Sequence, residues 1–164
     1  MPDFADAWVN LASLLVHRRP RDWESRADEA SERAVELSPK SSKAHYLRGL
    51  VLERTKRDDE AMKEFAAAGE DAHTTVKLAQ IAAREGNFAT AAEKMKASLS
   101  FSPIPDYRAQ AYVEFVLRLQ EPTSAQLDDA ERWARDLHEH GATERLRQVG
   151  AELLGKIDDL RPET

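Results

Sequence analysis

The sequence predicts an all-α protein built from stacked helical hairpins, with about nine helices and no sheet. Apolar residues recur at spacings of three and four residues, the period of an amphipathic helix. Glycines and prolines separate these helical segments. The alanines Ala27, Ala61 and Ala91 lie 34 and then 30 residues apart. One hairpin cannot bury its own apolar face, so this recurrence predicts hairpins that stack and share a core.

Composition limits the function classes. The chain has 164 residues, a length typical of one domain, and we expect a single domain over 1–164. Its net charge of −6 argues against general nucleic-acid binding, and the absence of cysteine excludes disulfides and thiolate metal sites. No apolar run is long enough for a membrane span, and no secretory signal is visible, which favours the cytoplasm and leaves the periplasm open. The preference for arginine over lysine favours a bacterial source.

The first repeat is expected over about 5–39. Apolar residues in 3–16 recur on one helical face, and Pro20 ends that segment because proline cannot continue the hydrogen-bond ladder. Asp22 is the expected N-cap of a second helix that ends near residue 37.

The second repeat is expected over about 42–71. Its helices are predicted at 42–55 and 59–68, and Gly69 suits the left-handed conformation that ends many helices. Gly49 occupies the small position where two helices cross. The repeat lacks a closing proline and is about four residues short, which predicts a second helix shortened by about one turn.

The third repeat is expected over about 72–105, and the rest of the chain repeats this helix–turn–helix unit. Helices are predicted at 71–84 and 88–99, joined by Gly86 and Asn87. Ala79 and Ala91 lie 12 residues apart, as do Gly49 and Ala61 in the repeat before, so a fixed internal offset accompanies the variable spacers.

The fourth repeat is expected over about 106–140, followed by a capping helix over 142–160. Its first helix, 106–119, is apolar on more than one side, which indicates either burial between neighbouring helices or a partner patch. Thr123 and Gln126 have the spacing of a capping box that starts its second helix.

In both spacing and residue type, the sequence resembles the tetratricopeptide repeat (TPR) family. The matching residues are Trp8, Leu11, Ala12, Leu15, Ala27, Ser31, Ala34 and Pro39, then His45, Gly49, Leu52, Ala61, Phe65 and Ala68, then Leu78, Ala79, Ala82, Ala91, Met95, Ser98 and Pro103, and finally Tyr112, Val116, Ala130 and Leu137. The resemblance implies a right-handed superhelix of antiparallel helix pairs whose concave groove holds a peptide or helix of a partner protein.

The family register also implies which residues line that groove. They are Val9, Asn10, Ser13, Tyr46, Leu50, Arg54, Val76, Lys77, Gln80, Arg84, Gln110, Glu114 and Arg118. The four cations among them predict a ligand with acidic residues flanking an apolar anchor. The alternative for these cations is that they only pair with nearby glutamates.

Two other functions stay open beside this non-catalytic scaffold. The array is either a self-associating structural module, or the repeat portion of a larger enzyme or assembly factor. Light scattering separates the scaffold from the self-associating module.

No pattern predicts catalysis, a cofactor or a metal site. Residues 150–157 resemble a phosphate-binding loop, but the serine or threonine after Lys156 is missing, and the segment has the apolar period of a helix. His138 and His140 are two apart, so they diverge on a helix and do not form a metal pair.

Overall fold

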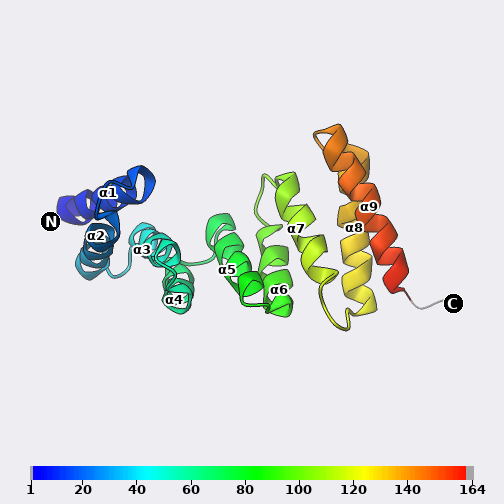
Figure 1. The fold of residues 1–164 in the computed structure, drawn as a ribbon, viewed down its shortest axis with the longest axis horizontal. Coiled ribbons are helices and arrows are strands. Elements are labelled where there is room, and N and C mark those ends of the chain that lie inside the picture. Colours follow the sequence, from blue (N-terminus) through cyan, green and yellow to red (C-terminus); the bar gives the residue numbers. More distant parts are fainter. Residues whose placement is uncertain (1, 162–164) are drawn as a thin grey trace. The chain divides into compact units, whose positions relative to one another are not determined.

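The computed structural model describes residues 2–161, and these form helices and connecting turns without any strand (Figure 1). The predicted all-α fold with nine helices is confirmed for this part of the chain. In chain order the helices are α1 Pro2–Arg18, α2 Trp23–Leu37, α3 Ser42–Arg54, α4 Asp58–Ala68, α5 Ala72–Arg84, α6 Phe88–Ser98, α7 Asp106–Val116, α8 Ser124–His140 and α9 Glu144–Leu160.

The chain folds as two compact units, Met1–Glu70 and Asp71–Thr164, here called unit 1 and unit 2. Unit 1 holds the hairpins α1–α2 and α3–α4, and unit 2 holds α5–α6, α7–α8 and the final helix α9. The single domain expected over 1–164 stays a prediction. None of the described helices combines the length and the apolarity that crossing a bilayer requires.

In unit 1, α3 packs against both α1 and α2 over small apolar clusters. One cluster contains Val9, Ala12 and Ala34, and another contains Leu15 and Val51. Alanine dominates the first cluster, so the helices approach closely and little apolar volume lies between them.

Gly49 lies directly against Phe65, which comes from the other helix of its hairpin. A Cβ atom at Gly49 would lie 2.7 Å from the Phe65 ring, which is too close for van der Waals contact. The predicted packing role of Gly49 is confirmed, and the absence of a side chain there is what lets the buried ring occupy the helix crossing.

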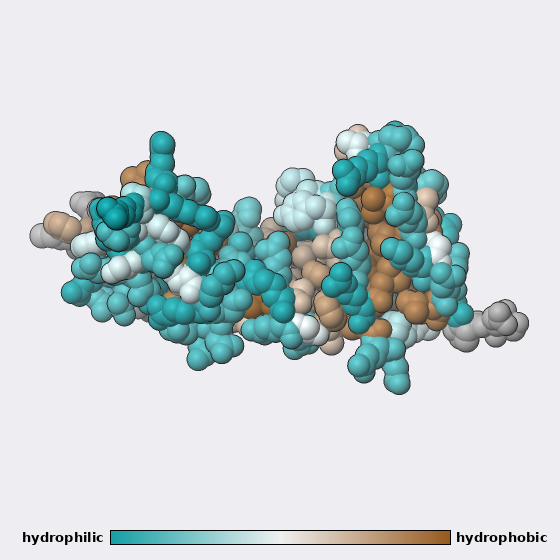
Figure 2. All heavy atoms as spheres, in the orientation of Figure 1, coloured by the Kyte–Doolittle hydropathy of each residue, from teal (hydrophilic) through white to brown (hydrophobic). Residues whose placement is uncertain are grey.

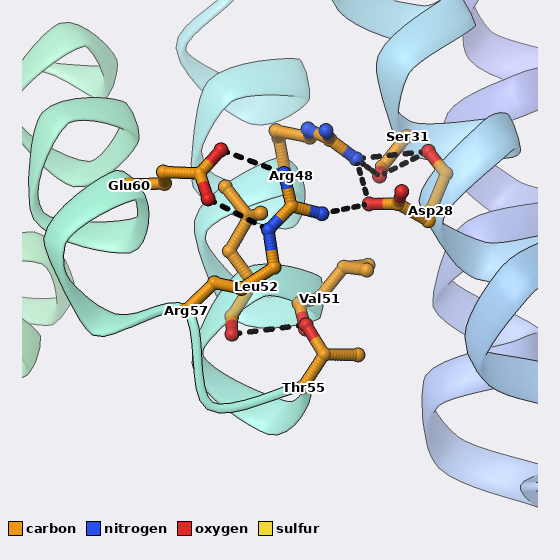
Figure 3. Close-up of polar contacts among 8 residues, drawn as sticks. All are labelled: Asp28, Ser31, Arg48, Val51, Leu52, Thr55, Arg57 and Glu60. Carbon is orange, nitrogen blue, oxygen red and sulfur yellow. Dashed lines mark hydrogen bonds and ion pairs between the residues drawn. The ribbon is translucent and has the colours of Figure 1, made fainter.

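A buried guanidinium also joins the hairpins of unit 1 (Figure 3). Arg48 Nη1 on α3 donates to the Asp28 carbonyl at 2.9 Å, to its carboxylate at 2.5 Å and to Ser31 Oγ at 3.0 Å, all on α2. Arg57 donates to the same Asp28 carboxylate at 3.0 Å and also binds Glu60. One carboxylate of α2 therefore receives arginines from α3 and from the α3–α4 turn.

Unit 2 has a larger continuous core that runs from Val76 on α5 to Ile157 on α9. Tyr112, Val113 and Val116 of α7 lie inside it, and Phe115 and Leu117 pack against it. Burial between neighbouring helices therefore explains most of the unusual apolarity of α7. Tyr107 is the exception, because 54% of its surface is exposed.

The loop before α7 is held by a second buried arginine. Arg108 donates to the carbonyl of Ser98 at 2.5 Å, to that of Phe101 at 3.1 Å and to that of Pro103. A guanidinium thus supplies a donor to the Ser98 carbonyl at the C-terminal end of α6, which has no partner within the helix, and donors to two carbonyls of the loop that follows. This ties the start of α7 to α6.

Helix ends agree with the sequence in some places and differ in others. The predicted capping box at Thr123 and Gln126 is confirmed. The prediction that the Asp22 side chain caps α2 is wrong: its backbone is left-handed, at φ 62°, and the side chain makes no capping hydrogen bond. Helix α7 ends at Val116 instead of residue 119, because the next turn tightens to bonds between residues three apart.

Candidate functional site

A cleft of about 400 Å³ lies between α7 and α9 in unit 2. In the space-filling view, hydrophobic residues form a band between these two helices (Figure 2). The residues that line the cleft are Gln110, Glu114, Leu117 and Arg118 from α7 and the turn after it, and Val149, Glu152, Leu153 and Lys156 from α9.

The helical period places these side chains on one face of α7. Gln110 and Glu114 are four residues apart, so they lie along one side of the helix, and Arg118 follows in the turn after it. Tyr112 and Val116, on the other side, are buried in the core. The core contacts therefore set the rotation of α7 and leave its polar stripe on the cleft.

Helix α9 supplies the second wall because it packs on α8 and touches α7. It approaches α8 closely at Gly150, where an added Cβ atom would lie 2.4 Å from the backbone nitrogen of His138. Gly150 is therefore required by the short distance to α8, and is not merely tolerated in the helix. The same segment, 150–157, is helical, so it forms no phosphate-binding loop.

The cleft combines apolar and charged groups. Leu153 is buried, and Leu117 and Val149 are partly buried and pack against the core of unit 2. The Glu114 carboxylate accepts a hydrogen bond from the Gln110 amide at 2.8 Å. Small-molecule and peptide sites usually have this composition, an apolar surface with a few convergent polar groups.

A second hollow of about 440 Å³ adjoins the turn between α5 and α6 and shares Arg118 with the cleft. It is lined by residues 86–89 and 118–120. The Arg118 guanidinium lies over the Phe88 ring, 5.2 Å from the ring centroid, a distance at which a cation is attracted to an aromatic face. Phe88 in turn lies against Phe115, with ring centroids 6.5 Å apart. These contacts hold Arg118 at the border of both hollows.

A polar network behind the cleft joins α7 to α6 and α8. Tyr112 donates its hydroxyl to the Asp129 carboxylate at 2.9 Å, and Lys96 Nζ lies 2.7 Å from the same carboxylate. Burial and the Asp129 hydrogen bond raise the pKa of Tyr112, so it remains a hydrogen-bond donor. Burial alone would raise the pKa of Asp129, but Lys96 and Tyr112 outweigh it and the pKa is lowered.

The structure brings together three of the predicted groove residues of unit 2, which are Gln110, Glu114 and Arg118. The α5 residues Lys77, Gln80 and Arg84 line neither hollow, although Gln80 and Arg84 are exposed.

In unit 1 the predicted groove residues are spread over surfaces of different kinds. Asn10 and Arg54 are exposed, and Ser13, Tyr46 and Leu50 are partly buried. Tyr46 packs against Phe65, with ring centroids 5.6 Å apart.

Two residues predicted for the groove belong to the core. Val9 is 3% exposed and packs with Ala12 and Ala30, and Val76 is 7% exposed within the core of unit 2. They leave almost no surface for a ligand, because the crossing of neighbouring helices turns these positions inward.

Sequence reasoning missed the α9 wall of the cleft. The sequence pattern indicates only a capping helix there, although Gln148, Glu152 and Lys156 repeat the four-residue spacing of Gln110, Glu114 and Arg118. That repetition was the available signal. The spacing alone does not show that α9 lies beside α7, because that depends on how α8 packs between them.

No protein-family model matches the chain, and no curated protein matches it in sequence. Among solved structures, the chain is similar to YrrB, which is described as a TPR protein with an unusual peptide-binding site. The TM-score is 0.66 at 18% sequence identity, and the match covers 95% of this chain and 86% of YrrB. The fold is therefore the TPR fold, which confirms the fold that the sequence resemblance implied.

Proposed function

We propose that this chain is a non-catalytic protein-interaction module that binds a short peptide segment of a partner in the α7–α9 cleft. The observation that carries the proposal is the cleft itself, in which partly buried apolar side chains lie beside charged groups from two packed helices. Such a surface offers an apolar anchor site together with orienting charges.

Two further observations support the proposal. Gln110, Glu114 and Arg118 are the positions that the TPR resemblance implies for the concave groove, and they line this cleft. YrrB, which shares the fold, is described as having a peptide-binding site. In repeat proteins of this kind, stacking creates an extended concave surface, and the side chains on that surface bind the ligand.

The test uses 12-residue peptides that are first selected from a random display library for binding to the whole protein. Glu152 is exposed and lines the cleft, so Glu152→Trp should fill it without disturbing the core. Glu139→Trp is the matched control, because Glu139 is an exposed glutamate of α8 that does not line the cleft.

We expect Glu152→Trp to weaken the selected peptides by at least about tenfold, a loss of about 1.4 kcal/mol. Glu139→Trp should bind them as the parent does, by fluorescence anisotropy. Equal binding by the parent and both variants would show that the cleft is not the peptide site.

Self-association is a second candidate function, and one surface of α1 favours it. Phe4 and Leu14 are each 59% exposed and Leu11 is 37% exposed, and their spacing of seven and three puts them on one side of the helix. A dimer in light scattering at about 100 μM, lost in the variant Phe4→Glu with Leu14→Glu, would support this function. A monomer at that concentration would exclude it.

A further inference from the structure

The charged residues of the cleft follow the same order along both of its walls. Glu114 on α7 and Glu152 on α9 are each the eighth residue after the first residue of the helix, and Arg118 and Lys156 come four residues later. Helices α7 and α9 run in the same direction, because α8 lies between them in an up-and-down arrangement (Figure 1). The two glutamates therefore lie toward one end of the cleft, and the two bases lie about 6 Å further along.

These four charges do not neutralise one another. A glutamate four residues before a lysine or arginine often forms an ion pair on a helix. Within residues 2–161, however, no ion pair joins Glu114 to Arg118 or Glu152 to Lys156. Glu114 accepts from Gln110 instead, and Arg118 lies over Phe88. Each end of the cleft therefore presents two like charges that no partner within the cleft compensates.

We infer that the cleft selects a peptide carrying a basic and an acidic side chain about 6 Å apart on one face, beside an apolar residue; this inference rests on the proposed function. The basic group lies between Glu114 and Glu152, and the acidic group lies between Arg118 and Lys156. The apolar residue contacts Leu117 and Val149, the partly buried apolar side chains of the cleft. A partner helix has this pattern when its two charges are four residues apart.

This pattern differs from the one expected from the sequence, a ligand with acidic residues on both sides of its anchor. Such a ligand would bring one carboxylate against the two glutamates of the cleft. Like charges placed together weaken binding and select against that partner. Because two glutamates form one end of the cleft, the ligand charge at that end must be basic, where the sequence-based expectation had it acidic.

The first experiment compares three alanine-based helical peptides that differ at only two positions. Each has one leucine and two charged positions four residues apart, occupied by Lys and Glu, by Glu and Glu, or by Lys and Lys. We expect the Lys–Glu peptide to bind the whole protein at least about tenfold more tightly than either like-charged peptide at low salt. Raising the salt should reduce this difference.

The second experiment exchanges the charges of the cleft. Glu114→Lys with Glu152→Lys makes all four groups basic, so the preference should move to the Glu–Glu peptide. Arg118→Glu with Lys156→Glu should move it to the Lys–Lys peptide. The matched control, Glu121→Lys with Glu139→Lys, changes the net charge by the same amount as the first exchange, at exposed positions outside the cleft, and should keep the preference of the parent.

The outcomes separate this inference from the proposed function. If Glu152→Trp blocks the peptides but the charge exchanges leave their ranking unchanged, the charge selection is wrong and the proposed function stands. If none of the three peptides binds with a Kd below about 1 mM, the charge selection is also wrong. Peptides from the random library that bind the Glu152→Trp variant as well as the parent would instead contradict the proposed function.

Discussion

Unit 1 and unit 2 have the same hairpin architecture but join their hairpins in different ways. In unit 1 the apolar clusters are small and rich in alanine, and the buried guanidinium of Arg48 links α3 to α2. In unit 2 a continuous apolar core extends from Val76 to Ile157. Polar contacts accompany that core: Arg108 of α7 donates to the Ser98 carbonyl of α6, and Lys96 of α6 pairs with Asp129 of α8.

The difference shows that the repeat pattern specifies how the two helices of one hairpin pack together. It does not specify how one hairpin packs against the next. Small residues at fixed positions bring two helices together in both units. Between hairpins, apolar burial is tolerant of geometry, whereas a charged network is stabilising only when every partner is in place. We therefore expect the loss of a single polar group to destabilise unit 1 more than unit 2, and a change of shape in the core to destabilise unit 2 more.

The largest expected effect is a change of shape in unit 2. In Gly150→Ala the new Cβ would lie 2.4 Å from His138 N and 2.8 Å from Ala134 O, so the backbone of α8 must move. We expect a loss of about 2–3 kcal/mol in the free energy of unfolding, measured by urea denaturation. Hydrogen exchange resolved by peptide should show faster exchange in α8 and α9 and no change in unit 1.

Gly155→Ala is the control on the same helix. Nothing lies within 4 Å of a Cβ at Gly155, so alanine should stabilise the helix, by up to about 1 kcal/mol. Equal effects of the two substitutions would contradict the close approach of α9 to α8.

The second largest effect is expected from removing the buried charge of Arg48 in unit 1. Arg48→Met keeps much of the side-chain volume but removes the donor to Ser31 Oγ and one of the two arginines that bind the Asp28 carboxylate. We expect a loss of about 2 kcal/mol, with faster exchange in α2 and α3.

Arg33→Met is the matched control for Arg48→Met. Arg33 is an exposed arginine of α2 that pairs with Glu36, and exposed pairs of this kind contribute little. If the two variants had the same stability, the buried network would not hold unit 1 together.

A smaller effect is expected from removing the hydrogen bond between Tyr112 and Asp129 in unit 2. Tyr112→Phe removes the hydroxyl bound to Asp129 but keeps the ring in the core, and Asp129 retains Lys96 and Arg132. We expect a loss of about 1 kcal/mol. Tyr107→Phe, at an exposed tyrosine of the same helix, should change the stability by less than about 0.5 kcal/mol. A loss as large as that of Arg48→Met would remove the contrast between the units.

The smallest effect concerns pH. His45 in unit 1 lies 2.6 Å from Glu64 and 3.0 Å from the Pro39 carbonyl. Burial alone would lower its pKa, but these hydrogen bonds outweigh burial and raise the pKa above 6.5. A raised pKa means that the folded state binds the proton more tightly, so this contribution to stability is complete below pH 6.5 and is lost as pH rises through the folded value.

The measurement is the urea midpoint of the parent and of His45→Gln from about pH 5.5 to about pH 8.5. The parent should lose more stability than the variant over this range. Asp129 in unit 2 has a lowered pKa, so its contribution is present above pH 3.8 and is lost as pH falls below that value. Parallel curves for the parent and His45→Gln would contradict the role of the His45–Glu64 pair.

One wall of the candidate site could be predicted from the sequence. Gln110 and Glu114 share a side of α7 because four residues are nearly one turn, and Arg118 follows in the next turn, so this wall needs only local geometry. The opposite wall, with Glu152 and Lys156, could not be placed, because it depends on how α8 returns the chain and how closely Gly150 lets α9 approach.

By itself the sequence determined the helical class, the positions of the helices, the capping box at Thr123 and the small residue at Gly49. These features depend on residues within a few turns of each other, where spacing and steric fit suffice. Only the tertiary structure decided that Val9 and Val76 lie in the core, that Arg48 is buried and that α7 and α9 enclose a cleft. Those outcomes follow from which faces meet between hairpins, and this depends on helix crossing geometry that the local pattern leaves undetermined.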